Sequence, residues 1–348
     1  MNEVDLVHEH RRLTARRVAI VVGLCVVAAA AFVMSNMVGA ISLTPSQVIG
    51  GIMVPSSLDE QTHTVLWDLR LPMAVMALLI GVSLSLAGAE MQTILGNPLA
   101  EPFTLGISAG AAFGGATAIV LGWQVVTNPQ LNLAVIAWIS SVGATAVIVI
   151  AAILRGARAE TMVLLGIGLV FFFQALLALI QYRASAEALS QIVFWSLGSM
   201  TRATWVANVL LAVVLVVVCP LLASQSWKLT ALRLGDARAQ SMGVNTSRLR
   251  IVVLVLSSLL ASTTVAFAGI IGFVGLVGPH IARMLVGEDQ RYFIPASMAS
   301  GAAVMCCAHA VSLMAKPGLA IPIGIVTSLL GVPFFLGIVL TRRRALWS

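Results

Sequence analysis

Residues 203–223 read ATWVANVLLAVVLVVVCPLLA, a stretch of 21 residues without a charged side chain. A helix of about 20 apolar residues is long enough to cross the hydrocarbon core of a bilayer. Stretches that are charge-free or nearly so recur along the whole chain. Together they predict ten membrane-spanning helices, at 18–41, 72–92, 104–121, 132–154, 161–181, 203–223, 251–269, 270–286, 292–313 and 319–341.

The composition agrees with this pattern. The chain has 348 residues, of which 59% are apolar and 9% are charged, against about a quarter charged in soluble domains. So few charges cannot cover a water-exposed surface, and such high hydrophobicity excludes disorder. Four cysteines are too few for a disulfide framework in a chain of this length. The sequence therefore predicts an all-α, polytopic membrane bundle.

The basic residues predict the orientation of this bundle. With ten spans and a cytoplasmic N-terminus, sixteen of the 20 basic residues lie inside and four lie outside, as the positive-inside rule requires. If the eighth segment did not cross, the division would be twelve against eight. We therefore expect both termini to be cytoplasmic, and we attribute the net charge of +7 to contact with anionic lipid rather than nucleic acid. The predicted divisions are a cytoplasmic tail at 1–17, a ten-helix domain at 18–341 and a basic cytoplasmic tail at 342–348.

The connections between spans carry further expectations. Residues 42–70 predict an outer loop, and 183–202 predict a helix at the outer interface that is too short to cross. The longest inner connection, 224–250, is polar and compatible with helix. The eighth segment, 270–286, contains three glycines and a proline near its start, so we expect it to be short and irregular.

Several classes of chemistry are disfavoured. Neither Lys228 nor Lys316 follows the glycine-rich turn of a P-loop, so the chain carries no Walker ATPase and no catalytic residues are proposed. Only Glu90 among the acids lies clearly within a span, and we expect it at the membrane interface near the inner end. Cys306 and Cys307 precede His309 by a few residues, but adjacent helical side chains diverge by about 100°, so no metal site is predicted.

Eight strings then point to a known family. They occur in order between about residues 65 and 340 and resemble the permeases of iron-chelate and vitamin B12 ABC importers, the FecCD type. The strings are RLP (70–72), AGAEMQ (87–92), NPLAEP (97–102), LGISAGA (105–111), LGDARAQSMGV (234–244), GFVGLVGPHIAR (272–283), IPIGIVT (321–327) and GVPFF (331–335).

The resemblance implies a transporter subunit rather than an enzyme. In this family two permease chains form a pathway across the cytoplasmic (inner) membrane, and two separate ATPase subunits hold ATP and Mg, so this chain itself needs no cofactor. An extracytoplasmic binding protein delivers the cargo. The expected cargo is an iron chelate, foremost a ferric siderophore, with haem or cobalamin as alternatives. A stand-alone secondary transporter coupled through Glu90 is the alternative from another class, and homodimer or heterodimer is left open.

The resemblance also implies roles for particular residues. The ATPase-coupling residues would be Leu234, Gly235, Asp236, Ala239 and Gly243. The residues that dock the binding protein would be Arg70 and Lys316. The translocation pathway would include Gly166, Gly168, Gln174 and Gln181. The sequence departs from the family pattern at Met73, His309, Leu313 and Ala320, which puts the docking residues in doubt.

Overall fold

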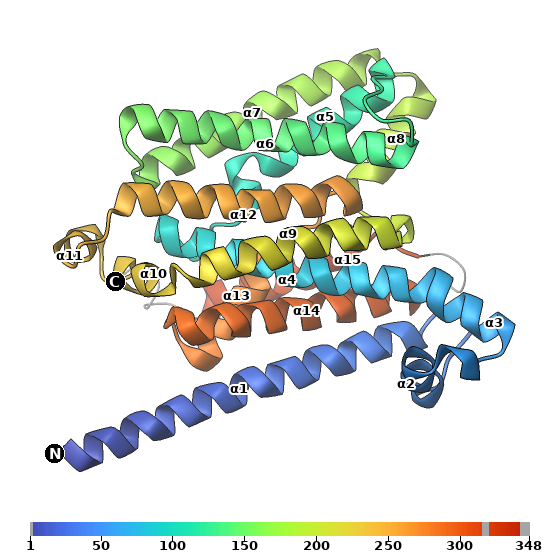
Figure 1. The fold of residues 1–348 in the computed structure, drawn as a ribbon. Coiled ribbons are helices and arrows are strands. Elements are labelled where there is room, and N and C mark those ends of the chain that lie inside the picture. Colours follow the sequence, from blue (N-terminus) through green and yellow to red (C-terminus); the bar gives the residue numbers. More distant parts are fainter. Residues whose placement is uncertain (1–2, 315–319, 342–348) are drawn as a thin grey trace.

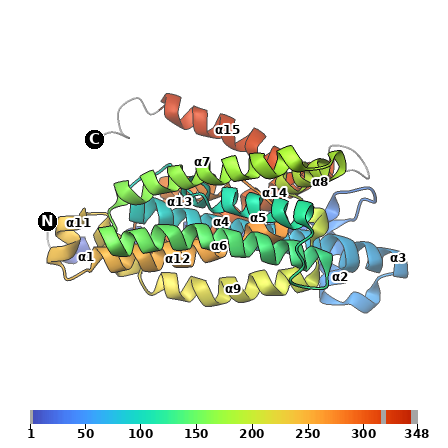
Figure 2. The same ribbon diagram turned by 90° about the horizontal axis from the view of Figure 1, so that it is seen from above.

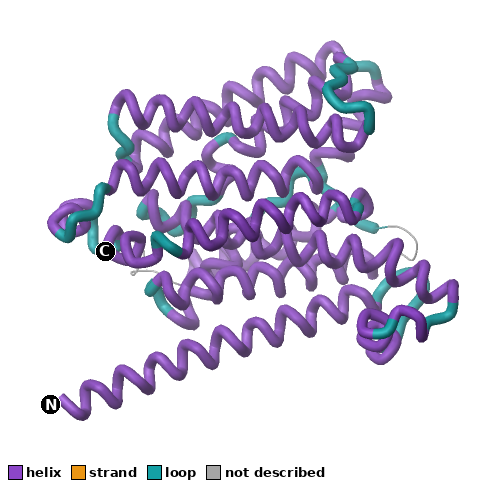
Figure 3. The backbone as a smooth tube through the Cα atoms, in the orientation of Figure 1, coloured by secondary structure: helices purple, strands orange, loops and turns teal. Residues whose placement is uncertain are grey.

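The computed structural model describes residues 3–314 and 320–341, and these residues form helices and loops without a strand (Figures 1 and 3). The long and apolar helices are α1 (Glu3–Met37), α4 (Leu71–Leu95), α5 (Ile107–Leu121), α6 (Pro129–Arg155), α7 (Ala159–Arg183), α9 (Trp205–Ala223), α12 (Thr246–Ala268), α13 (Val274–Val286), α14 (Gln290–Met314) and α15 (Ile323–Thr341). The shorter elements are α2 (Pro45–Met53), η1 (Pro55–Ser57), α3 (Glu60–His63), η2 (Thr64–Arg70), η3 (Pro102–Leu105), α8 (Ala186–Ser196), η4 (Met200–Arg202), α10 (Ser226–Leu232) and α11 (Asp236–Ser241).

The ten predicted spans correspond one to one with the ten long and apolar helices. Seven helical segments are long and apolar enough to cross a membrane, and α5, α13 and α15 are shorter apolar helices. The 13 residues of α13 rise only about 20 Å, less than the roughly 30 Å of a hydrocarbon core. Residues 270–273 before it are irregular, as its glycines predict. The all-α bundle of about ten helices is confirmed.

Two boundaries differ from the sequence prediction. α1 begins at Glu3, so residues 3–17 continue the first span as helix. The outer loop predicted at 42–70 is largely helical, and α3 and the π-helical η2 lead without a break into α4. The signal was present at Asp59, whose carboxylate accepts a hydrogen bond from the Thr62 backbone N–H and caps α3. Polar residues follow Asp59, and for that reason the sequence predicted a loop rather than this helical extension. The predicted tail at 342–348 lies outside the described residues.

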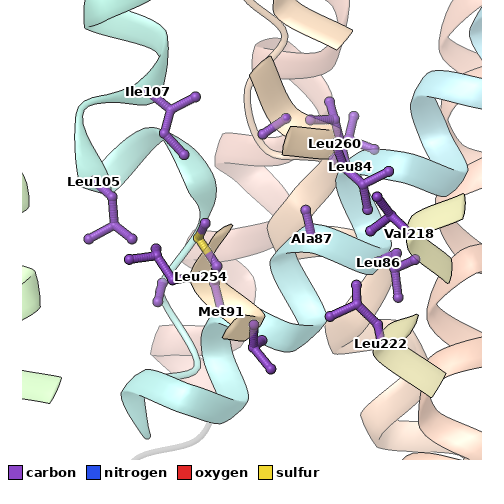
Figure 4. Close-up of a cluster of buried hydrophobic side chains, with 14 of the residues drawn as sticks. Leu84, Leu86, Ala87, Met91, Leu105, Ile107, Val218, Leu222, Leu254 and Leu260 are labelled. Atoms are coloured by element: carbon purple, nitrogen blue, oxygen red, sulfur yellow. The ribbon is translucent and has the colours of Figure 1, made fainter. Parts of the chain in front are cut away.

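α4 lies at the centre of the bundle, and most of its side chains are buried. It packs against α9, α12, α13 and α14. Figure 4 shows Leu84, Leu86 and Met91 of α4 close to Val218 of α9 and Leu254 of α12. A helix buried on all sides has no lipid-facing stripe, which explains why its residues show no amphipathic pattern.

Small residues bring the helices around α4 into close contact. A methyl group on either Gly81 or Gly301 would overlap the backbone of the other glycine, so α4 and α14 can approach this closely only without side chains there. Gly88 makes a similar approach to Gly275 in α13. In lipid no hydrophobic effect drives association, and such close packing supplies much of the attraction between helices.

The ends of the bundle differ in composition. α10, α11, the start of α1 and the end of α15 lie at the arginine-rich end, which we call the inner end; α2, α3 and α8 lie at the opposite, outer end (Figure 1). Seen along the perpendicular direction, α7 and α15 lie on one side of the bundle and α9 on the other (Figure 2). The bundle thus presents two distinct lateral faces.

Candidate functional site

The clearest candidate is α11 at the inner end, which projects beyond the ends of α6 and α12 (Figure 1). Gly235 precedes it with φ of +96°, and Gly243 follows its last turn with φ of +82°. Residues with a Cβ rarely adopt such angles, so glycine is needed at both positions. The sequence indicated that the 224–250 connection is compatible with helix, and α11 agrees with that. Ala239 is buried and Leu234 is exposed.

Arg250 fastens α11 to the bundle. Its guanidinium donates two hydrogen bonds of 2.7 Å to the two carboxylate oxygens of Asp236. It also donates to the backbone carbonyls of Ile94, at 2.8 Å, and Ala157, at 3.3 Å. The end of α4, the loop that leads into α7, α12 and α11 therefore meet at one buried side chain. The hydrogen bonds from Arg250 hold the pKa of Asp236 below its ordinary value of 3.8.

α10 makes a second set of connections. Arg233 forms an ion pair with Glu288, and Glu288 is also paired with Arg283 of α13 at 3.1 Å. Burial lowers the pKa of the Arg233 guanidinium. The Thr230 hydroxyl accepts a hydrogen bond from the Gln290 backbone N–H at the start of α14. Displacement of α10 and α11 would therefore act on α4, α7, α12, α13 and α14 through polar contacts.

The predicted pathway residues lie on α7, whose only buried residues are Met162 and Gly166. Gly166 packs closely on Thr104 and Leu105, so it serves helix packing as well. Gly168 faces open space. Gln174 is exposed on the bundle surface and Gln181 is half-buried. An amide group exposed to lipid would have no hydrogen-bond partner, which favours water or a partner chain over lipid at Gln174.

Of the two residues expected to dock the binding protein, the structure describes Arg70. Arg70 is 5% exposed, and its guanidinium donates to the carbonyls of Asn36 and Met37 at the end of α1 and of Ile41 in the loop that follows. In this arrangement it caps a helix and has no exposed charge to offer a binding protein. Lys316 lies outside the described residues.

Glu90 lies near the inner end of α4, as expected, and its side chain is fully buried among the helices. Neither carboxylate oxygen has a hydrogen-bond partner among the described residues. Of the four residues that depart from the family pattern, His309 is buried and Met73, Leu313 and Ala320 are half-buried.

The adjacent side chains of Cys306 and Cys307 in α14 have different surroundings, as expected for neighbours on a helix. Cys306 is fully buried, whereas Cys307 lines an apolar cavity of about 330 Å³ between α13, α14 and α15. Within residues 3–314 and 320–341, no group of three or more His, Cys, Asp or Glu side chains could hold a metal ion.

Sequence reasoning missed Arg250. From the sequence it was counted only among the sixteen inner basic residues. Its position near the inner end of a span was a signal, because a charge within a membrane helix usually has a defined partner. Its partners are far away in the sequence, at residues 94, 157 and 236, so only the fold brings them together.

Comparison with known proteins gives a consistent result. The model of the FecCD transport family matches residues 25–342. An ABC transporter permease protein of Methanocaldococcus jannaschii is 36% identical over 346 residues, covering 97% of this chain and 98% of that protein. The hemin transport system permease protein HmuU of Yersinia pestis is 32% identical and covers 82% of this chain and 87% of its own length.

A vitamin B12 import system permease protein, BtuC of Vibrio cholerae, is 34% identical over 81% of this chain and 83% of its own length. Among solved structures, a metal-chelate type ABC transporter in an inward-facing conformation superposes with a TM-score of 0.83 at 32% identity. It covers 93% of this chain and 99% of that chain.

Proposed function

The chain belongs to the FecCD transport family and is an ABC importer permease, and we propose that the cargo of this importer is an iron chelate, specifically a ferric siderophore. Haem and cobalamin are the alternatives within the same class. The alternative of a stand-alone secondary transporter coupled through Glu90 does not agree with this family. We further propose that the chain works in the cytoplasmic membrane.

The cargo proposal rests on the exposed surface of α7, which we call the α7 face. This face combines exposed Phe171 and Phe172 with the exposed amide of Gln174 and contains no charged residue between Glu160 and Arg183. A naked ion needs a dense set of oxygen ligands to replace its hydration shell. A chelate brings its ligands with it and can pass an apolar wall with few polar groups. The hemin and vitamin B12 relatives support a chelate, whereas a molybdate import permease of Haemophilus influenzae, 34% identical, broadens the range of cargoes among the relatives.

The partners follow from the same proposal. Two ATPase subunits, which would hold ATP and Mg, dock against α11 and the exposed Leu234 at the inner end. A second permease chain lies against the α7 face, so that the pathway runs between two chains. An extracytoplasmic binding protein delivers the chelate to the outer end. Each of these assignments extends the family membership to a surface of this chain.

In this mechanism the chain transmits motion. Closure of the ATPase subunits displaces α11, and the Asp236–Arg250 pair passes this displacement to the ends of α4, α7 and α12. The Arg233–Glu288 pair passes it to α13. Helices joined by close glycine contacts move as rigid units, so the bundle reorients and opens the α7 face to the inner side.

The test is purification of the chain from native membrane in mild detergent, followed by reconstitution with the ATPase that accompanies it. We expect an ATPase subunit to co-purify and the reconstituted importer, with its binding protein, to take up a ferric siderophore in an ATP-dependent manner. Uptake of haem or cobalamin instead would select the alternative cargo. A chain that purifies alone and carries a substrate without ATP would contradict the ATPase assignment.

A further inference from the structure

A cavity of about 490 Å³ lies at the outer end of the bundle, where α6, α8, α9 and α12 meet. It is bounded by the start of α6, by α8, by η4 and the start of α9, and by the end of α12. Its volume falls within the range of roughly 300–1,000 Å³ that is usual for small-molecule sites. None of the pathway or coupling residues described above lines it.

Two hydrogen-bond donors of this cavity lack an acceptor among the described residues. Arg202 uses Nη2 to donate to the Phe194 carbonyl at 3.0 Å, but its Nη1 is buried without a partner. The indole Nε1 of Trp195 is also buried without a partner, in a side chain that is 4% exposed. Buried donors without acceptors are costly, and most buried polar groups in proteins are satisfied. Both residues line the cavity, so an occupant with an anionic acceptor would complete the site.

The charge of the site favours an anion. Its described lining includes Arg202 and no acidic residue. Burial lowers the pKa of the Arg202 guanidinium, which means that the charged form lacks solvation that a bound anion would replace. The N-terminus of α6, at Asn128–Leu131, also borders the cavity, and its dipole adds a partial positive charge.

The remaining walls are mostly apolar, with Gln191 and Thr204 as the polar exceptions. Leu133 of α6, Val206 of α9 and Phe267 of α12 line the cavity, and Val206 and Phe194 are exposed on the bundle surface. On α9 the exposed valines continue toward the membrane centre, at Val209, Val213 and Val216. An occupant therefore needs a negative head at the outer end and an apolar tail that runs along α9.

We propose that this cavity binds an anionic phospholipid of the outer leaflet. Its phosphate accepts hydrogen bonds from Arg202 Nη1 and Trp195 Nε1, with a small reorientation of the two side chains, and an acyl chain lies between α6 and α9. The lipid then holds α8 and the start of α9 against α6 and α12. This role is separate from cargo transport and does not depend on which chelate is carried.

The test is native mass spectrometry of the purified full-length chain, titrated with phosphatidylglycerol or with phosphatidylcholine of the same acyl chains. We expect phosphatidylglycerol to bind preferentially and Arg202→Gln to weaken its binding by about tenfold or more, as expected for a lost hydrogen bond to a charged group. Arg183→Gln is the matched control, since Arg183 is an exposed arginine at the same end of the bundle and does not line the cavity. It should bind phosphatidylglycerol as the unaltered chain does.

Further variants keep the test decisive if Arg202→Gln does not fold. Trp195→Phe retains the ring and removes the N–H, and should weaken phosphatidylglycerol binding several-fold, whereas Arg202→Lys should retain most of it. Equal binding of the two lipids, or unchanged binding in both Arg202→Gln and Trp195→Phe, would overturn the proposal. Displacement of the lipid by inorganic phosphate alone would also overturn it, because the occupant would then be a free anion.

Discussion

Arg250 and Asp236 connect two environments of different polarity. The Arg250 side chain is 8% exposed and the Asp236 side chain is 50% exposed. The pair therefore reaches from the buried ends of α4 and α7 to the surface of α11. A guanidinium at this depth is stable only because the two carbonyls and the carboxylate satisfy its donors. We infer that Asp236 stabilises the fold and fixes the position of α11 at the same time.

The pH dependence of stability should report this pair. The pKa of Asp236 is lowered in the folded chain, so its ionised form contributes stability above its ordinary value of 3.8, and that contribution is lost as the pH falls through the lower folded value. We expect Asp236→Asn to destabilise the chain at neutral pH by at most about 2 kcal/mol, because water screens the exposed carboxylate.

The measurement is the thermal unfolding of both proteins in detergent over a pH series. The difference between them should be constant above about pH 5 and should shrink below the ordinary pKa of aspartate. Glu60→Gln is the control, since Glu60 is an exposed acid at the outer end of the bundle. A difference that persists unchanged at acid pH would mean that the ion pair contributes nothing.

At the scale of elements, the sequence was most informative where lipid dictates composition. α1, α7 and α9 expose apolar side chains along most of their length, so hydropathy alone predicts them. Gly235 and Gly243 flank α11, and their positive φ angles are a local requirement that glycine meets. α3 and η2 were missed because polar residues can form helix outside the membrane as readily as loop. The contacts of Arg250 depend on tertiary packing, and no local pattern contains them.

The ends of α11 provide a test at this scale. Gly235 has φ of +96° and open space around it, so Gly235→Val is opposed by backbone strain rather than by a clash. Such strain costs roughly 1–3 kcal/mol and should turn α11 away from its present position. We expect the variant to fold but to lose several-fold in ATPase association, measured by co-purification.

Gly122→Val is the matched control for this variant. Gly122 also has a positive φ, of +64°, and open space, but it lies at the outer end of α5. A valine there should also carry backbone strain, from the left-handed conformation, and should leave ATPase association unchanged. Equal losses in both variants would assign the effect to general instability, and no loss in Gly235→Val would contradict the coupling role of α11.

For the whole molecule, the ten helices place the start of α1 and the end of α15 at one end, and the arginines assign that end to the cytoplasm. Ser190 in α8 and Ser241 in α11 are exposed at opposite ends of the bundle. We expect a membrane-impermeant maleimide to label Ser190→Cys from the extracytoplasmic side only and Ser241→Cys from the cytoplasmic side only. Right-side-out and inverted vesicles measure this directly, with the unaltered chain as the control for its four native cysteines. The reverse pattern would move α11 away from any cytoplasmic ATPase and would place the Arg202 cavity in the inner leaflet, so this single measurement bears on both the coupling surface and the lipid site.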